Sequence, residues 1–205
     1  GANQTLTASD NATLDVGGNA AMQINGVLNV DAGQTLNITG GGTVAINSSN
    51  TALSNTATLS VANSTLALGS ATATGNAQVT LANSTVQAST ANVAIQQANV
   101  SGNVQFAGNA VAVQTLDTSA GAATLTIGQN GVQVAALSGT NNVTLAAGRI
   151  TLTGNSTAFQ QTLDVSSDAE VEIDPNAVVG GSVTLAGNGT IDGAVLGAVT
   201  VNDVN

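Results

Sequence analysis

A short phrase that begins with Thr-Leu returns along the chain at a nearly constant step. Its copies begin at Thr13, Thr35, Thr58, Thr80, Thr124, Thr144, Thr162 and Thr184, with a degenerate copy at Gln105. The mean step is about 21 residues, inside the window that marks stacked repeat proteins. A repeat of that length cannot bury an apolar face alone, so it must stack on its neighbours. We expect one solenoid domain over residues 1–205, with about nine coils.

Short segments within each repeat alternate apolar and polar residues, as half-buried strands do. They pair as 35–38 with 44–46, 58–61 with 66–68, 124–127 with 132–134 and 162–165 with 171–173. Weaker third strands are expected at 27–30, 93–95 and 178–179. Two to three strands per coil, joined by Asn, Gly and Ser corners, predict an all-β chain folded as a parallel β-helix. A β-sandwich also gives short, evenly spaced strands, but its strands do not usually copy each other.

The charge balance excludes two classes of partner. Arg149 is the only basic side chain, against eleven acids, and the net charge is -10. Nucleic-acid binding needs many Lys and Arg to neutralise phosphates, and an anionic membrane surface needs them too. No stretch reaches the roughly 20 apolar residues that span a bilayer. We expect neither nucleic-acid binding nor membrane insertion.

The chain offers little for catalysis. It has no His, Cys or Lys, so the usual acid–base groups, nucleophiles and zinc or copper ligands are missing. Sugar rings usually stack on aromatic side chains, and neither Tyr nor Trp occurs. We expect no enzyme activity and no cofactor.

One acidic cluster carries the alternative hypothesis. Asp168, Glu170, Glu172 and Asp174 alternate with apolar residues, so a strand would put all four carboxylates on one face. This face is a weak candidate for a Ca²⁺ site or a glycosidase carboxylate pair, and it could serve a carbohydrate-acting or carbohydrate-binding protein. The simpler interpretation is a solvated outer face.

Arg149 is expected to join this cluster. Aligning residues 150–152 with residues 171–173 in the next coil places Arg149 over Glu170. We therefore predict an ion pair between these two side chains, worth at most about 1 kcal/mol if it is exposed.

Glycosylation sequons are denser than composition predicts. Asn-x-Ser/Thr occurs at Asn3, Asn11, Asn37, Asn47, Asn63, Asn83, Asn99, Asn142, Asn155 and Asn188. The 24 Asn and 44 Ser plus Thr give about five such triplets by chance. The excess favours an exported, possible glycoprotein, although Asn-Ser and Asn-Gly are also turn chemistry.

Residues 27–38, 42–46 and 123–128 resemble the passenger domains of bacterial autotransporters and filamentous-haemagglutinin-type adhesins. The likeness is one of texture and period, and it covers most of the chain. It implies a right-handed parallel β-helix at the cell surface or outside the cell, used for adhesion or structure. Possible partners are a glycan or a host surface.

The ends of the repeat array point to self-association. Residues 6–16 already carry the repeat's pattern, and residues 195–201 remain apolar with little charge. Uncapped solenoid ends leave strand edges unpaired, and a head-to-tail contact between copies propagates as a filament. A terminal strand that completes the next subunit would give the same polymer. We expect a self-assembling structural protein, in a filament or a surface adhesin.

Overall fold

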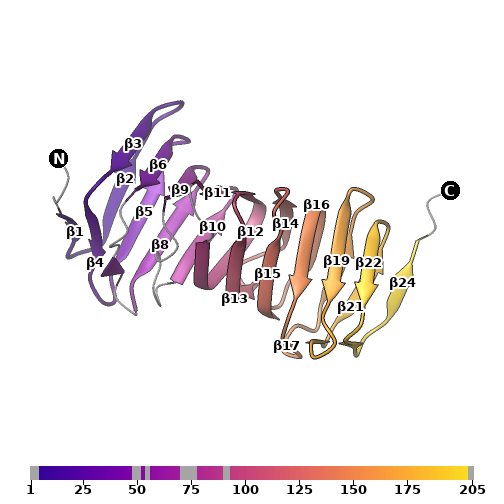
Figure 1. Cartoon of the computed structure of the whole chain (residues 1–205). Helices are drawn as coiled ribbons and strands as arrows, with labels where there is room; N and C mark the ends of the chain where they lie inside the picture. The colour runs from indigo at the N-terminus through magenta and orange to yellow at the C-terminus, as the bar shows by residue number, and fades with distance from the viewer. Residues whose placement is uncertain (1–4, 48–51, 54–55, 70–77, 90–92, 203–205) are drawn as a thin grey trace.

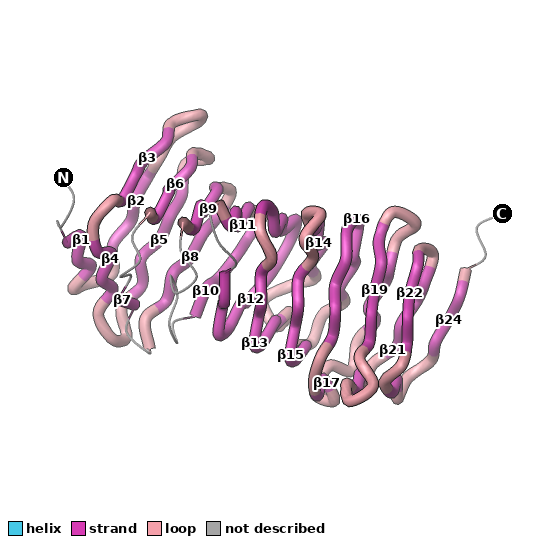
Figure 2. Tube along the Cα trace, viewed as in Figure 1, coloured by secondary structure: helices cyan, strands magenta, loops and turns pink. Residues whose placement is uncertain are grey.

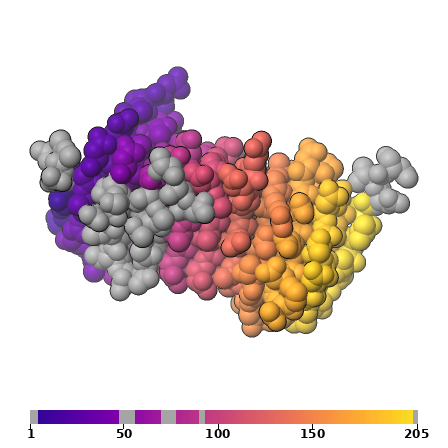
Figure 3. Space-filling view, in the orientation of Figure 1, coloured from indigo at the N-terminus to yellow at the C-terminus, as the bar shows by residue number. Residues whose placement is uncertain are grey.

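The computed structural model describes residues 5–47, 52–53, 56–69, 78–89 and 93–202. Strands that stack side by side along one axis make up this part of the chain, and it contains no helix (Figures 1 and 2). Every strand pairing is parallel, as expected when successive coils lie on one another. The prediction of an all-β solenoid is confirmed, and its long body is seen in Figure 3.

The strands are short in most coils. They are β1 (Thr5–Ala8), β2 (Ala12–Asp15), β3 (Ala21–Ile24), β4 (Val27–Val30), β5 (Thr35–Thr39), β6 (Thr43–Ile46), β7 (Ala52–Leu53), β8 (Thr58–Ala62), β9 (Thr65–Leu68), β10 (Gln78–Ala82), β11 (Thr85–Ala88), β12 (Val93–Gly108), β13 (Val111–Asp117), β14 (Ala123–Ile127), β15 (Val132–Ser138), β16 (Val143–Leu152), β17 (Asn155–Ser156), β18 (Thr162–Val165), β19 (Ala169–Ile173), β20 (Val178–Val179), β21 (Ser182–Leu185), β22 (Asn188–Ile191), β23 (Ala194–Val195) and β24 (Val199–Val201).

Two long sheets run the length of the described chain. Sheet 1 stacks β2, β5, β8, β10, β12, β13, β15, β16, β19 and β22. Sheet 2 stacks β3, β6, β9, β11, β12, β14, β16, β18, β21 and β24. Strands β12 and β16 are long enough to pass through both sheets. Ten strands in each sheet make nine full turns from the first coil to the last.

A third side changes place along the solenoid. In the first coils it is the sheet of β1, β4 and β7, which lies where the chain passes from sheet 2 to sheet 1. In the last coils it is the sheet of β17, β20 and β23, where the chain passes from sheet 1 to sheet 2. The third side makes one corner of the coil wide, and this wide corner therefore moves from one edge of the cross-section to the other.

The core is a pile of small aliphatic side chains. Along sheet 1 one inward column consists of Leu36, Leu59, Val79, Ala98, Leu116 and Leu137, all buried. Each member lies about 4.8 Å from the next, because that is the strand spacing. The two aromatic side chains, Phe106 and Phe159, are also buried. Layers this narrow suit Ala, Val, Leu and Ile better than rings.

The recurring phrase does not mark one position of the coil. Thr35 does lie over Thr58, but Thr13 lies over Asn37 and Ser60 over Thr80, a slip of two residues. From the degenerate copy at Gln105 onward the phrase belongs to sheet 2 instead of sheet 1. A slip of two residues keeps every apolar side chain on the inside. The alternation of apolar and polar residues is therefore preserved although the Thr-Leu phrases are not aligned.

The predicted strands are confirmed. All eight paired segments are strands, and the segments at 27–30 and 178–179 lie on the third side. The segment at 93–95 belongs to sheet 1, as the first part of β12.

Gly148 gives a test of coil-to-coil crowding. It turns the chain between the two sheets within β16, with φ +82°, and a Cβ there would collide with the carbonyl of Ile127 in the coil below. Gly33 has a similar φ of +76° but open space around it. We expect Gly33→Ala to lower the free energy of unfolding by about 1 kcal/mol, from backbone strain alone. Gly148→Ala should cost about 3 kcal/mol, because overpacking adds to that strain.

Urea denaturation followed by circular dichroism measures both losses, with Gly33→Ala as the matched control. Equal losses for the two variants would show that the coils are not in close contact at Gly148.

Candidate functional site

The predicted acidic face lies on the outside of sheet 1 near its last coils. Strand β19 alternates buried and half-buried residues, with Ala169, Val171 and Ile173 inside. Glu170 and Glu172 point outward from the same strand, while Asp168 and Asp174 flank it. The period-two pattern therefore puts the carboxylates on the solvent side, which is the arrangement that the sequence predicted.

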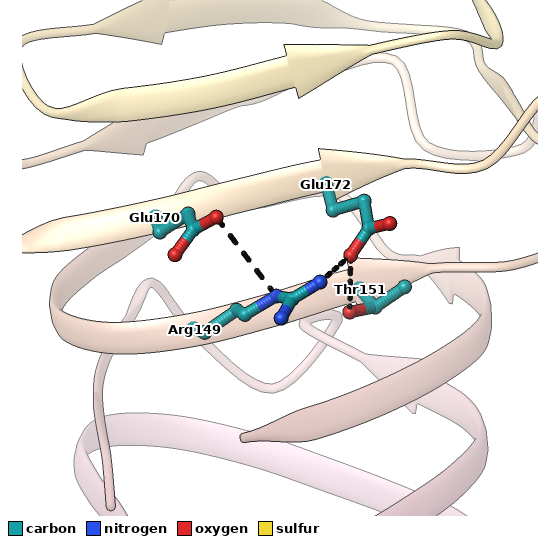
Figure 4. Close-up of polar contacts among 4 residues, drawn as sticks. All are labelled: Arg149, Thr151, Glu170 and Glu172. Carbon is teal, nitrogen blue, oxygen red and sulfur yellow. Dashed lines mark hydrogen bonds and ion pairs between the residues drawn. The ribbon is translucent and has the colours of Figure 1, made fainter. Parts of the chain in front are cut away.

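Arg149 lies directly beside this face (Figure 4). Strand β16 pairs with β19 in the register Arg149 to Glu170, and Arg149 Nε lies 4.0 Å from Glu170 Oε1. Its NH2 group is closer still to Glu172 Oε2, a contact that the sequence did not predict. Thr151 Oγ1 donates a hydrogen bond to the same Glu172 oxygen at 3.4 Å. One guanidinium thus lies between two carboxylates of the next coil.

The sequence carried only part of the signal for the second contact, because spacing puts Glu172 on the same face as Glu170 but does not fix how far the Arg149 side chain reaches. Residues two apart on a strand share a face, and a guanidinium reaches the diagonal neighbour across the strand pair. The side chain of Arg149 is 50% exposed and that of Glu170 is 46% exposed. Pairs in such contact with water contribute about 1 kcal/mol or less. The cluster therefore reduces charge repulsion on this face more than it stabilises the fold.

A shallow depression of about 570 Å³ adjoins the pair. Its lining includes Arg149, Asp168, Glu170, Gln129 and Asn188. Within the described ranges, no group of three or more carboxylates is arranged to hold a metal ion. The four acids proposed as weak Ca²⁺ ligands thus lie along one face without converging on a point.

The sequon asparagines lie on the surface of the solenoid. Exposed positions are Asn11, Asn47, Asn63, Asn83, Asn142, Asn155 and Asn188, while Asn37 and Asn99 are half-buried on strands of sheet 1. Asn3 falls outside the described residues. Accessible side-chain amides are a requirement of N-glycosylation, and these positions meet it.

Several of these asparagines also have a structural role that the sequence reasoning missed. Asn11 Oδ1 accepts a hydrogen bond from the Thr35 backbone N–H at 2.8 Å. Two other pairs make the same contact between neighbouring coils. The Asn103 N–H donates to Asn83 Oδ1 at 3.0 Å, and the Thr162 N–H donates to Asn142 Oδ1 at 3.1 Å. Each amide satisfies a backbone donor of the next coil: Thr35 and Thr162 begin strands β5 and β18, and Asn103 follows Gly102, where β12 enters sheet 2. Hydrogen bonding by asparagine side chains at the corners therefore accounts for part of the high number of sequons.

The two end coils differ from the coils between them. At the first coil, β2 and β3 each pair with a single described strand, β5 and β6, and Leu6 in β1 is 37% exposed. At the last coil, β22, β23 and β24 each pair on one side only, with β19, β20 and β21. There Leu196 is 64%, Val199 47% and Val201 70% exposed. Within the described part of the chain, both ends therefore present apolar side chains beside strand edges that lack a partner on one side.

No protein-family model, curated protein or solved structure matches this chain. None of the described residues form a helix long and apolar enough to cross a membrane. The function is therefore inferred from the geometry described above.

A polar corner around Asp117 lies between sheets 1 and 2 in the middle coils. The Ser138 hydroxyl donates to Asp117 Oδ2 at 2.7 Å, and the Ser119 N–H donates to Oδ1 at 2.8 Å. Buried Thr118 donates through Oγ1 to the Asn141 carbonyl at 2.8 Å, so the corner is tied to the next coil. Burial alone would raise the pKa of Asp117, but the hydrogen bonds from Ser138 and Ser119 bring that pKa below 3.8.

This shift has a defined pH dependence. Because the native pKa lies below the unfolded value, Asp117 stabilises the fold above that value and the gain is lost as pH falls through the native pKa. We expect Asp117→Asn to lower the free energy of unfolding by about 1 kcal/mol at pH 7 and to have less effect near pH 2. Thermal unfolding at both pH values measures this. Asp164→Asn, on sheet 2, is the control for the same change of charge; an equal response of both variants would contradict the assignment.

Proposed function

We propose that this chain is a non-enzymatic structural protein that polymerises head to tail. It would be the subunit of an extracellular filament or a segment of a cell-surface adhesin. The observation that carries this proposal is the pair of end coils, whose outer strand edges no described residue covers. A strand edge has unpaired N–H and C=O groups, and soluble solenoids usually cover such edges with charged or atypical caps.

The exposed apolar side chains at the last coil favour self-association over an edge that stays in contact with water. Val199 and Val201 occupy positions that, one coil earlier, hold the buried Val183 and Leu185. Another coil on top would remove them from water, with a gain of about 25 cal/mol for each Å² of apolar area. The same coil would supply the hydrogen-bond partners that the edge strands lack.

Composition supports a place outside the cell. A surface of Asn, Gln, Ser and Thr with one basic residue gives few sites to proteases that cleave beside Lys or Arg. Exposed sequons are compatible with export through a glycosylating pathway. In the adhesin version of the proposal, the outer faces of the sheets would contact a glycan or a host protein.

Electron microscopy of the purified protein tests polymerisation. We expect unbranched fibres with an axial repeat of about 48 Å, since ten coils rise about 4.8 Å each. Val201→Asp should abolish them because it places a charge inside the contact between copies. Thr200→Asp, which points outward from the same strand, is the matched control and should still form fibres. Isolated rods at all protein concentrations would rule out the filament.

A carbohydrate-acting or carbohydrate-binding protein is the second candidate function. The depression beside Arg149 favours it, because Asp168 and Glu170 border a hollow large enough for a sugar ring. Against catalysis, the carboxylates of Glu170 and Glu172 both contact the one guanidinium of Arg149, whereas a glycosidase pair faces the scissile bond from opposite sides.

Oligosaccharide turnover and binding on a broad glycan panel test this candidate. If it holds, Glu170→Gln and Glu172→Gln each reduce turnover by about 100-fold or more, the usual loss on removing a catalytic acid or base. Absence of both turnover and binding in the unaltered protein would exclude it.

A further inference from the structure

We infer that copies stack in one register, in which residues 12–24 of the first coil lie over residues 189–201 of the copy below, 177 positions later in the chain. This inference rests on the proposed head-to-tail assembly and adds the interface to it. The occupant of the last coil is the first coil of a second copy. Ile191 then lies under Leu14, Val199 under Met22 and Val201 under Ile24.

The corner between the two sheets gives the first argument. In the first coil, the step from Leu14, the last inward residue of β2, to Met22 in β3 is eight positions. In the last coil, the step from Ile191 in β22 to Val199 in β24 is also eight positions. The corresponding steps in the adjoining coils are six, from Ile38 to Val44, and ten, from Ile173 to Val183. In the length of this corner the two end coils therefore match each other better than either matches its own neighbour, although the last coil forms the corner through β23 and the first coil has no strand there.

Side-chain alternation gives the second argument. A shift of one residue would turn every apolar side chain of one coil outward, so only shifts by an even number are open. The register of 177 lays Ile191 and Gly189 of β22 over Leu14 and Ala12 of β2. It also overlaps all of β24 with β3, whereas slips of two leave part of each strand unpaired.

Continuity of the sheets favours a second copy as the occupant. Sheets 1 and 2 both end at the last coil in strands whose direction is that of β2 and β3, so both sheets can continue across the junction in parallel. The contact would repeat the coil-on-coil packing that occurs nine times within the chain. Both edge strands are satisfied at once, which a single added strand cannot do.

The same register makes one unfavourable contact. Asp192 of one copy lies beside Asp15 of the next, and both residues are exposed at the outer face of sheet 1. Like charges opposite each other across a strand pair are destabilising. Assembly should therefore strengthen with added salt, because salt screens this repulsion.

Engineered disulfides test the register, and the chain has no cysteine of its own to interfere. Thr13→Cys with Thr190→Cys places the two exposed positions about 4.8 Å apart across the junction, within disulfide range. We expect a ladder of covalent oligomers on a non-reducing gel after oxidation. Thr13→Cys with Asn188→Cys is the control for a slip of two residues. It separates the positions by about 8 Å, so cross-linking should fall at least tenfold.

The outcomes separate the two proposals. Fibres with a ladder from the Thr190 pair support both. Fibres with a ladder only from the Asn188 pair, or from neither, overturn the register and leave the filament standing. Absence of fibres in the unaltered protein overturns the filament and the register with it.

Asp15→Asn provides a measurement without cross-linking. We expect it to lower the critical concentration for polymerisation about threefold at low salt, with the advantage lost at 1 M salt. Asp164→Asn changes the net charge equally, far from either end, and should have a smaller effect. Equal effects would show that Asp15 does not face a carboxylate and would count against the register.

Discussion

Parallel backbone pairing between successive coils is the constraint on which this structure depends. Each inner strand donates hydrogen bonds to, and accepts them from, the coils on both sides, so a coil has its hydrogen bonds satisfied only when it is covered above and below. Short strands of four or five residues suffice because neighbours on both sides hold them. Inward side chains then meet others of similar size, as Leu59 meets Leu36 and Val79. This explains a core that needs almost no aromatic residues.

The polar chemistry of the chain is concentrated at corners and on one outer face. Asn11, Asn83 and Asn142 use their side-chain oxygens to accept a backbone N–H of the next coil where the chain enters one of the two sheets. Asp117 ties two corners together through Ser138. Arg149 offsets two of the carboxylates that would otherwise repel one another on β19. These groups hold coils together, and none of them requires a bound ligand to explain its position.

The sequence predicted the architecture because alternation and repeat length are local properties. Strands at 35–38, 162–165 and 171–173 could be identified from apolar spacing alone. Register was harder to predict, since a slip of two residues keeps Leu and Val inside and leaves no trace in the pattern. The phrase at Thr124 therefore looked equivalent to that at Thr58 although the two lie in different sheets.

In the candidate site, too, the features set by local spacing could be predicted and those set by contacts between coils could not. The face of Glu170 and Glu172 followed from period-two spacing, and so did the position of Arg149 over Glu170. The nearer contact of Arg149 with Glu172 depends on side-chain reach across a strand pair, which sequence spacing does not determine. The hydrogen bond that Asn83 accepts at its corner depends on the positive φ of Asn83 and on a partner twenty residues away. No local sequence motif predicts it.

The migration of the wide corner has a practical consequence for any assembly of this chain. Rungs that are nearly alike are difficult to tell apart in an averaged image of a long fibre. Here the outline of the solenoid bulges on one side near β4 and on the other near β20. At each join the profile must step abruptly from one side back to the other, and that step is a built-in landmark for where one molecule stops and the next starts.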